Sequence, residues 1–245
     1  MKIEIAGENA LILYFDDKAS PEVAAKIYQA QQLIREYCAE VLIDLIPSYA
    51  SILVIFDLFK CDHLYLKAKL QHCLNKLQVS NVMDGRLVEL PAYYGIECAP
   101  DLAALAQRAE LSIEEVITIH QRQEYRVYAI GFAPGFAYLG DVDDRIAAPR
   151  LATPRMKVPK GAIAIADKQT AVYPSISPGG WNLIGLCPTA MFNAEKEPTM
   201  PVSVGDRVKF CQINKSEFLA LGGQLGDQLR DQLREQLNEK LSEQR

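Results

Sequence analysis

The second half of the chain consists of short β-type runs separated by glycine and proline, and this rhythm restricts the folds open to it. Each run has only four to seven residues, mostly branched, aromatic or small and apolar. Many short strands with frequent turns are typical of a β-barrel or a β-sandwich. We therefore predict such a fold for this half, with strands at Tyr125–Ile130, 161–166, 170–173, 181–184 and 207–213.

The first eighty or so residues instead alternate between strand and helix patterns. Ser20 and Pro21 form a helix start, because a hydroxyl N-cap is followed by proline at the first helical position. Asp62 is placed to cap a second helix, and 47–48 (Pro-Ser) predicts a turn between two β-rich runs. The element order predicts a small α+β structure with helices on one face of an antiparallel sheet, the strands lying at 2–6, 10–15, 41–46 and 49–56.

The pattern changes at residues 81–85, which we interpret as the joint between two domains. A strand at 87–93 and two short helices then precede the β-rich part, the second helix opened by a capping box of Ser112 and Glu115. After Gly222 a four-residue, leucine-containing repeat of low complexity predicts an exposed, partly helical tail. We expect a domain at 1–83, a second at 84–218 and a tail at 219–245.

The composition excludes several classes of protein. Twenty-six basic against 31 acidic residues give a net charge of −5, which argues against a nucleic-acid-binding protein. No apolar run approaches the ~20 residues that a membrane-spanning helix needs, and the N-terminus lacks the pattern of a signal peptide. We therefore expect a cytoplasmic protein without membrane contact, and free thiols rather than disulfides for its six cysteines.

Several strong motifs are absent from the sequence. It contains no Gly-x4-Gly-Lys-Ser/Thr loop for a nucleotide and no Gly-x-Ser-x-Gly nucleophile turn. Cys61, His63, His72 and Cys73 lie close together, but nine helical residues place the two histidines on opposite faces. We therefore expect no bound metal in this chain, because zinc ligands must converge on one point.

The segment 131–140 (GFAPGFAYLG) follows a predicted strand and combines glycine, proline and three aromatic side chains. Glycine permits close backbone approach and positive φ, and the aromatic residues can line one wall of a site. The alternative is a tight barrel loop with aromatic residues in the core. The candidate binding residues are Gly131, Phe132, Pro134, Gly135, Phe136 and Tyr138.

The segment 148–161 (APRLATPRMKVPKG) places four cations among prolines in an acidic protein. Side chains alternate along an extended chain, so Arg155 and Lys157 would project to the same side. Such a pair can bind a carboxylate or phosphate, Arg as a bidentate clamp and Lys as a point charge. A solvated edge strand is the competing interpretation.

The segment 173–185 (YPSISPGGWNLIG) places a Pro-Gly-Gly turn before the single tryptophan and a strand. The turn can expose backbone N–H groups as an anion site. It can equally be a hairpin with a core tryptophan. The candidate residues are Pro178, Gly179, Gly180 and Trp181.

In this order, the three segments together resemble the KipI/allophanate-hydrolase-subunit-1 family, also called carboxyltransferase subdomains C and D. The matching stretches are 131–140, 153–161 (TPRMKVPKG) and 177–185 (SPGGWNLIG), followed by 204–210 (VGDRVKF). The resemblance implies an α+β fold: a small ferredoxin-like α+β N-terminal domain followed by a cyclophilin-like β-barrel. It does not imply prolyl isomerase activity, because fold alone does not carry function.

The resemblance also implies one component of an ATP-dependent 5-oxoprolinase, which converts 5-oxoproline to glutamate and is inactive without its homologous C component and its A component. ATP with Mg²⁺ would act at the level of the complex, without biotin. Charge then develops on phosphoryl and amide oxygens. Arg155 and Lys157 would contact the carboxylate or phosphate with Lys160 in support, while the 131–138 loop and the 178–181 turn would form a pocket wall or a contact with the C component.

Two other functions stay open. One branch of the family resembles inhibitors that bind a sensor histidine kinase, and the same barrel could present Phe132, Phe136 and Tyr138 to a partner helix. The other is a component of an allophanate- or urea-type amide hydrolase or carboxyltransferase. Such domains are usually fused to a biotin-dependent carboxylase, and the sequence holds no such region.

Overall fold

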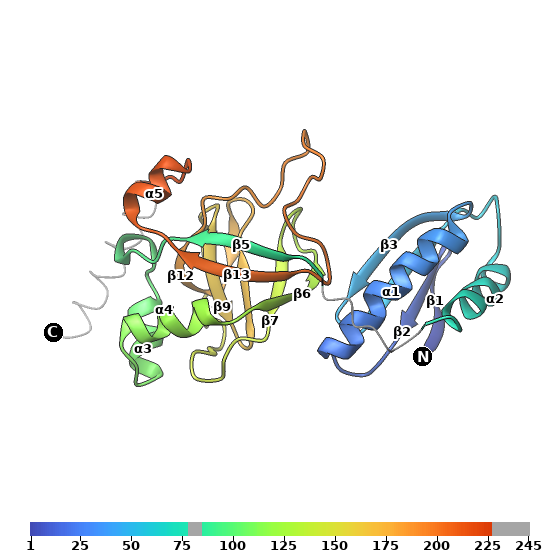
Figure 1. The fold of residues 1–245 in the computed structure, drawn as a ribbon, viewed down its shortest axis with the longest axis horizontal. Coiled ribbons are helices and arrows are strands. Elements are labelled where there is room, and N and C mark those ends of the chain that lie inside the picture. The colour runs from blue at the N-terminus through green and yellow to red at the C-terminus, as the bar shows by residue number, and fades with distance from the viewer. Residues whose placement is uncertain (78–84, 227–245) are drawn as a thin grey trace. The chain divides into compact units, whose positions relative to one another are not determined.

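A computed structural model describes residues 1–77 and 85–226 (Figure 1). Residues 81–84 of the predicted joint and residues 227–245 of the predicted tail lie outside these ranges. The chain forms two compact units. The first comprises Met1–Arg86, Arg126–Ile130 and Ser203–Arg207, and the second comprises Leu87–Tyr125, Gly131–Val202 and the residues from Val208 on.

The first unit has the predicted order of two strands, a helix, two strands and a helix. Its antiparallel sheet has the order β1-β2-β4-β3. Its elements are β1 (Lys2–Gly7), β2 (Ala10–Tyr14), α1 (Pro21–Cys38), β3 (Leu42–Ser48), β4 (Ser51–Phe56) and α2 (His63–Leu74).

Both predicted helix starts are confirmed. The Ser20 hydroxyl accepts a hydrogen bond from the Val23 N–H, and the Asp62 carboxylate accepts one from the Tyr65 N–H. Each bond satisfies a backbone donor that the first turn of a helix leaves open. Pro21 occupies the start of α1, where its missing N–H costs nothing.

The predicted turn at Pro47 and Ser48 is wrong. Strand β3 continues through Pro47, which lies opposite Ile52 of β4, and the chain reverses at Tyr49 and Ala50. Tyr49 has a φ of 45°, and positive φ suits the tight turns that join twisted antiparallel strands. A proline can stand in a strand wherever its position needs no N–H donor, so its presence alone did not locate the turn.

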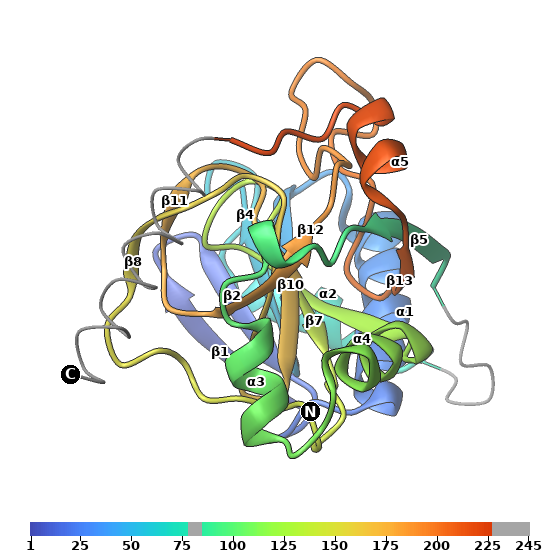
Figure 2. The same ribbon diagram turned by 90° about the vertical axis from the view of Figure 1, so that its left-hand side faces the viewer.

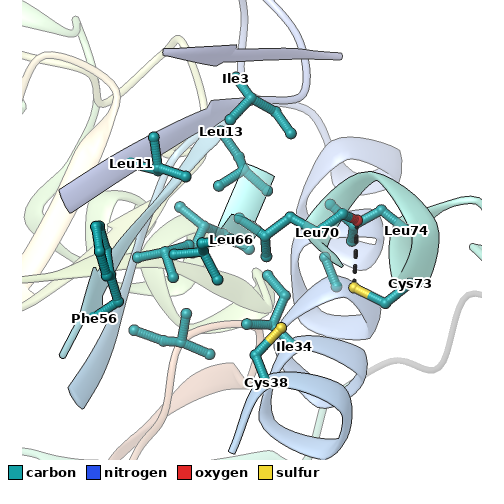
Figure 3. Close-up of a cluster of buried hydrophobic side chains, with 14 of the residues drawn as sticks. Ile3, Leu11, Leu13, Ile34, Cys38, Phe56, Leu66, Leu70, Cys73 and Leu74 are labelled. Carbon is teal, nitrogen blue, oxygen red and sulfur yellow. Dashed lines mark hydrogen bonds between the residues drawn. The ribbon is translucent and has the colours of Figure 1, made fainter. Parts of the chain in front are cut away.

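The core of the first unit lies between the sheet and the two helices (Figure 3). Along β4 every second side chain is buried, as expected for a sheet covered on one face. Each fully buried Leu, Ile or Phe contributes roughly 1.5–3 kcal/mol of transfer free energy. The labelled core includes Leu11, Leu13, Ile34, Phe56, Leu66 and Leu70.

The second unit is mainly antiparallel β structure with short helices. Its helical elements are η1 (Ile96–Cys98), α3 (Leu102–Arg108), α4 (Ile113–Arg122) and α5 (Lys215–Ala220). The strands that follow β4 in the chain are β5 (Leu87–Ala92), β6 (Tyr125–Ile130), β7 (Ala137–Gly140), β8 (Arg155–Val158), β9 (Ala162–Ala166), β10 (Gln169–Val172), β11 (Ser177–Gly179), β12 (Asn182–Leu186) and β13 (Arg207–Gln212). The predicted strands are confirmed to within two residues at each end.

Strands β7, β10, β9 and β12 form a continuous antiparallel run. Tyr93, directly after β5, continues the run because it exchanges two 2.8 Å backbone hydrogen bonds with Leu186 at the end of β12. Strand β13 in turn pairs with β5. A separate two-stranded ribbon of β8 and β11 lies outside this run (Figure 2). The chain is thus mixed α and β, with large antiparallel pairing.

Small residues on β9 make room for large aromatic ones in this core. Ala162, Ala164 and Ala166 are all buried in the same cluster as Phe136 and Trp181. Because protein interiors are closely packed, a strand with methyl side chains admits rings that isoleucine or leucine would exclude. The alternation of alanine and isoleucine along β9 therefore positions the aromatic side chains of the candidate site.

One buried histidine ties α4 to this sheet. His120 is fully buried and hydrogen-bonds through Nδ1 to the Tyr94 hydroxyl (2.8 Å) and through Nε2 to the Thr170 hydroxyl (3.1 Å). Burial lowers the pKa of His120 to about 3, because a cation is poorly solvated there. The imidazole is therefore neutral at ordinary pH and serves packing.

Candidate functional site

All three segments singled out from the sequence contribute residues to one cavity of about 100 Å³ in the second unit. One wall comes from the connection between β6 and β7 and from β7 itself, and another from the turn between β11 and β12. Its lining residues are Phe132, Phe136, Tyr138, Arg150, Tyr173, Pro178, Gly179, Gly180 and Trp181.

The aromatic wall is built on a tight turn. Gly131 N–H donates to the Phe136 carbonyl and Phe136 N–H to the Ala133 carbonyl, each over 3.0 Å. Gly135 has a φ of +87°, and a Cβ there would lie 2.6 Å from the Met191 carbonyl oxygen, so only glycine fits. Phe132 also has a positive φ, 71°, which costs free energy at a bulky residue. Its side chain is 66% exposed.

Phe136 is the centre of this wall. Its ring meets those of Phe132, Tyr138, Tyr173 and Trp181 edge to face, with centroid distances of 5.3, 4.9, 5.2 and 5.6 Å. Edge-to-face pairs add attraction beyond area burial, since the positive ring edge meets the negative ring face. Phe136 is only 2% exposed, so the wall is fixed by packing.

The Pro-Gly-Gly turn approaches the wall closely at one point. A Cβ on Gly179 would lie 2.3 Å from the Tyr173 hydroxyl oxygen, so this glycine is required by contact. Burial raises the pKa of Tyr173 to about 12, while the charge of Arg150 and the Trp181 backbone N–H act in the opposite direction. The hydroxyl therefore keeps its proton at neutral pH and can donate it to an acceptor.

Arg150 supplies the positive charge of the cavity. Its guanidinium carbon lies 5.8 Å from the centre of the Trp181 ring, a cation–π arrangement. Two hydrogen bonds fix its neighbours to the turn: Asn182 Nδ2 donates to the Pro149 carbonyl (2.9 Å), and Leu151 N–H donates to the Gly180 carbonyl (2.7 Å). Within the described residues no carboxylate forms an ion pair with Arg150, so its charge is available to an anionic ligand.

The three cations predicted to be catalytic lie elsewhere. Arg155 Nη2 donates to Asp101 Oδ1 over 2.7 Å, and both side chains are largely buried. Lys157 is exposed on β8. Lys160 lines a second cavity, of about 180 Å³, together with Cys187 and Thr189. The extended chain thus places Arg155 and Lys157 in different surroundings.

Of the ten predicted wall residues, seven line the cavity, and Gly131, Pro134 and Gly135 do not. The sequence interpretation did not single out Arg150, Tyr173 or Asp101. Arg150 is one of four cations in the segment 148–161, and no sequence signal distinguished it from the other three. Tyr173 is the first residue of the segment 173–185, outside its Pro-Gly-Gly turn. Asp101 was visible only as the start of a helix.

The described part of the chain shows neither a metal-binding cluster nor a membrane-spanning helix. No group of three or more His, Cys, Asp or Glu residues is placed to hold a metal ion in residues 1–77 and 85–226. In the same ranges no helix is both long and apolar enough to cross a membrane. The six cysteines are free thiols, as predicted.

A concave, mostly aromatic cavity with one placed cation is typical of a site for a small anionic molecule. The chain belongs to the family described as carboxyltransferase domain, subdomain C and D, whose sequence profile matches residues 1–202. The resemblance drawn from the three segments is therefore confirmed.

Individual relatives agree with this assignment. The chain is 37% identical over 229 residues to the B subunit of 5-oxoprolinase from Bacillus subtilis (strain 168), covering 89% of this chain and 95% of that protein. The crystal structure of TTHA0988 matches with a TM-score of 0.74 at 33% identity, over 84% of this chain but only 40% of that one. Kluyveromyces lactis urea amidolyase matches with a TM-score of 0.69 at 15% identity, over 89% of this chain and 15% of that one, which shows a shared fold alone.

Proposed function

We propose that the chain is the B component of an ATP-dependent 5-oxoprolinase, which converts 5-oxo-L-proline to L-glutamate, and that the aromatic cavity binds 5-oxoproline. The identity to a protein of that name over nearly its whole length supports the activity. One observation carries the site: segments 132–138 and 178–181, far apart in sequence, meet around one cavity together with Arg150.

The chemistry of 5-oxoproline matches this cavity. The molecule is a five-membered lactam ring with one carboxylate. Aromatic faces suit the ring, and the Arg150 guanidinium can hold the carboxylate through two parallel hydrogen bonds. Tyr173 lines the same cavity, and its protonated hydroxyl can donate a hydrogen bond to the lactam oxygen of a bound ligand. A volume of about 100 Å³ suits such a ring and is far below the roughly 300–1,000 Å³ typical of larger ligands.

ATP with Mg²⁺ is assigned to the assembled complex rather than to this cavity. A lactam is a poor electrophile, and ATP bound in the complex would supply the phosphoryl chemistry that activates it toward water. Cavities of about 100 and 180 Å³ are small for a nucleotide, and the sequence has no P-loop. The residues of this chain would bind the ring, orient the carboxylate and exclude water. A direct contact of Lys157 and Lys160 with carboxylate or phosphate stays a prediction.

The partners would be the A component and the homologous C component of the enzyme, and the chain alone would be inactive. Phe132 supports a contact with a partner, because a large apolar side chain is held exposed in a strained backbone conformation beside the cavity. Such strain persists where the surroundings fix it, often at binding sites. Free thiols throughout support a reducing compartment, the cytoplasm.

We assign the first unit to the ferredoxin-like class and the second to the cyclophilin-like barrels. In the first, β2, α1 and β3 form a split β-α-β unit with β4 between the strands. In the second, the antiparallel run of β7, β10, β9 and β12, which Tyr93 continues, would form one wall of the barrel. The Tyr125 ring contacts Phe210 of β13, and the Gly131 N–H donates to the Phe136 carbonyl.

The test is ATP-dependent release of glutamate from 5-oxoproline by the complex of this chain reconstituted with its A and C components. Omission of the chain should abolish the activity. Arg150→Ala should raise KM for 5-oxoproline by roughly 10–150-fold, as expected for the loss of a charged hydrogen bond. Arg145→Ala is the matched control, because Arg145 pairs with Asp143 on the surface of the same unit.

Full activity without this chain would refute the proposal and favour the kinase-inhibitor alternative. Normal kinetics of Arg150→Ala in an active complex would leave the activity standing but move the substrate site away from the aromatic cavity.

A further inference from the structure

A buried ion pair connects two elements that lie beside the strands flanking the Pro-Gly-Gly turn, since β8 pairs with β11 and α3 packs against β12. Arg155 lies in β8 and Asp101 is the N-cap residue of α3, and their side chains are 9% and 12% exposed. The guanidinium Nη2 and the carboxylate Oδ1 are 2.7 Å apart. Unlike a surface pair, a buried pair strongly disfavours the loss of one partner, because the remaining charge stays buried without compensation.

Asp101 holds one end of the Pro-Gly-Gly turn. The Leu183 N–H donates to Asp101 Oδ2 over 2.6 Å, and the Asp101 N–H donates to the Leu183 carbonyl over 3.1 Å. Leu183 lies two residues after Trp181, in β12. The first residues of β12 are therefore fixed to the carboxylate that Arg155 contacts.

Arg155 holds the other end. In the β8–β11 ribbon the residue opposite Arg155 is Gly179, the last residue of β11. The turn from Gly179 to Leu183 thus has Arg155 at one end and Asp101 at the other. The ion pair joins these two anchors across 54 residues of sequence.

We propose that the Arg155–Asp101 ion pair positions the Pro178–Trp181 wall of the aromatic cavity, so that Arg155 is a positioning residue rather than a catalytic one. The pair sets the spacing of β11 and β12, and with it the place of Trp181 and of the Gly180 carbonyl that holds the segment around Arg150. The effect on turnover rests on the proposed function, whereas the effect on the wall does not.

Within the described residues Arg155 donates a hydrogen bond to Asp101 from Nη2 but none from Nη1, and this favours positioning rather than stability as the role of the pair. The Arg155 Nη1 is buried and has no hydrogen-bond acceptor among the residues that the structure describes. An open buried donor costs free energy, and an apolar pair of similar volume is often at least as stabilising. What an apolar pair cannot do is hold a backbone N–H and a facing strand at one defined spacing.

Trp181 provides a direct readout, since it is the single tryptophan of the chain and is 4% exposed. Arg155→Met and Asp101→Asn should shift its fluorescence emission to the red and raise its quenching by acrylamide in the full chain without ligand. Asn keeps an acceptor for the Leu183 N–H and so isolates the contact with Arg155. In Arg155→Lys the new ammonium group can still reach Asp101, so the emission of Trp181 and its quenching by acrylamide should stay close to wild type.

Arg145→Met is the matched control. It breaks an Arg–Asp pair of the same length, 2.7 Å, in the same unit, but on the surface, and should leave Trp181 fluorescence unchanged. In the reconstituted complex, Arg155→Met should lower kcat/KM for 5-oxoproline by about 100-fold, mainly through KM, as expected for a displaced binding wall.

Wild-type Trp181 fluorescence in folded Asp101→Asn and Arg155→Met would overturn the proposal. So would a loss of kcat with unchanged KM and unchanged fluorescence, which would make Arg155 a catalytic residue. If Arg155→Met does not fold, Asp101→Asn and Arg155→Lys carry the same comparison. A wild-type complex inactive on 5-oxoproline, with the fluorescence changes present, would refute the proposed function but not the positioning role.

Discussion

The two glycines of the Pro-Gly-Gly turn are adjacent in the sequence, yet they should respond very differently to alanine. A Cβ on Gly179 would lie 2.3 Å from the hydroxyl oxygen of Tyr173 and 2.9 Å from its Cζ. A Cβ on Gly180 would meet nothing closer than the Leu151 carbonyl oxygen at 3.5 Å, an ordinary contact. Neither glycine has a positive φ, so the difference is one of space.

The size of the effect follows from how little Tyr173 can move. Its ring is 2% exposed and packs edge to face against Phe136, so the clash has to displace the turn or the ring. Overpacking of this kind costs about 1–3 kcal/mol, and the upper end applies because both sides are fixed. For a protein of this size about 3 kcal/mol lowers Tm by roughly 6–12 °C. Gly180→Ala should stay within about 0.5 kcal/mol of wild type.

A double-mutant cycle with Tyr173→Phe tests the cause. Removing the hydroxyl leaves the ring carbon at 2.9 Å as the nearest atom to the new methyl group. Gly179→Ala should therefore be less destabilising in the Tyr173→Phe background, with a coupling of about 1 kcal/mol. Urea unfolding followed by Trp181 fluorescence measures all four proteins. Equal stability of Gly179→Ala and Gly180→Ala, or a coupling near zero, would refute the reasoning.

Three further predictions follow from single side chains. His120 is neutral when folded, with a pKa of about 3, but protonates near 6.5 when unfolded, so its contribution to stability is present above pH 6.5 and is lost as pH falls. Between pH 7 and 5 it should account for about 2 kcal/mol of lost unfolding free energy, and urea unfolding of His120→Leu should show a correspondingly smaller pH dependence. Ser112→Ala removes the hydroxyl half of the capping box at α4 and leaves the Ser112 N–H bond to the Glu115 carboxylate, so it should cost about 1 kcal/mol in the same assay, a result that unchanged stability would contradict. Lys160 forms no ion pair within residues 1–77 and 85–226, so Lys160→Ala should leave Tm unchanged, and any fall in 5-oxoprolinase activity would then report chemistry rather than folding.

Local signals predicted most elements of the fold. Ser20, Asp62 and Ser112 cap helices as expected, because a capping side chain acts within three residues of its own position. The longer β-rich runs are strands for a similar reason, since their side chains suit a half-buried pleated surface. The turn at Pro47 and Ser48 failed because pairing across the hairpin, rather than the proline, sets where β3 ends.

Two of the short strands escaped prediction. Strands β7 and β11 have four and three residues, lie within glycine- and proline-containing motifs, and exist because a partner strand is present. Neither has enough residues to show an alternating pattern. Their register, which places Gly179 opposite Arg155, is a property of the pairing and not of either segment.

The sequence by itself determined the family, the aromatic loop and the Pro-Gly-Gly turn, because these depend on residue types at fixed short spacings. Only the tertiary structure decided which of four nearby cations meets the aromatic wall. Arg150 lies over Trp181, whereas Arg155 turns to Asp101, 54 positions earlier in the chain. The physical reason is that a charge takes its role from its partner in space, and the folding of distant strands brings that partner into place.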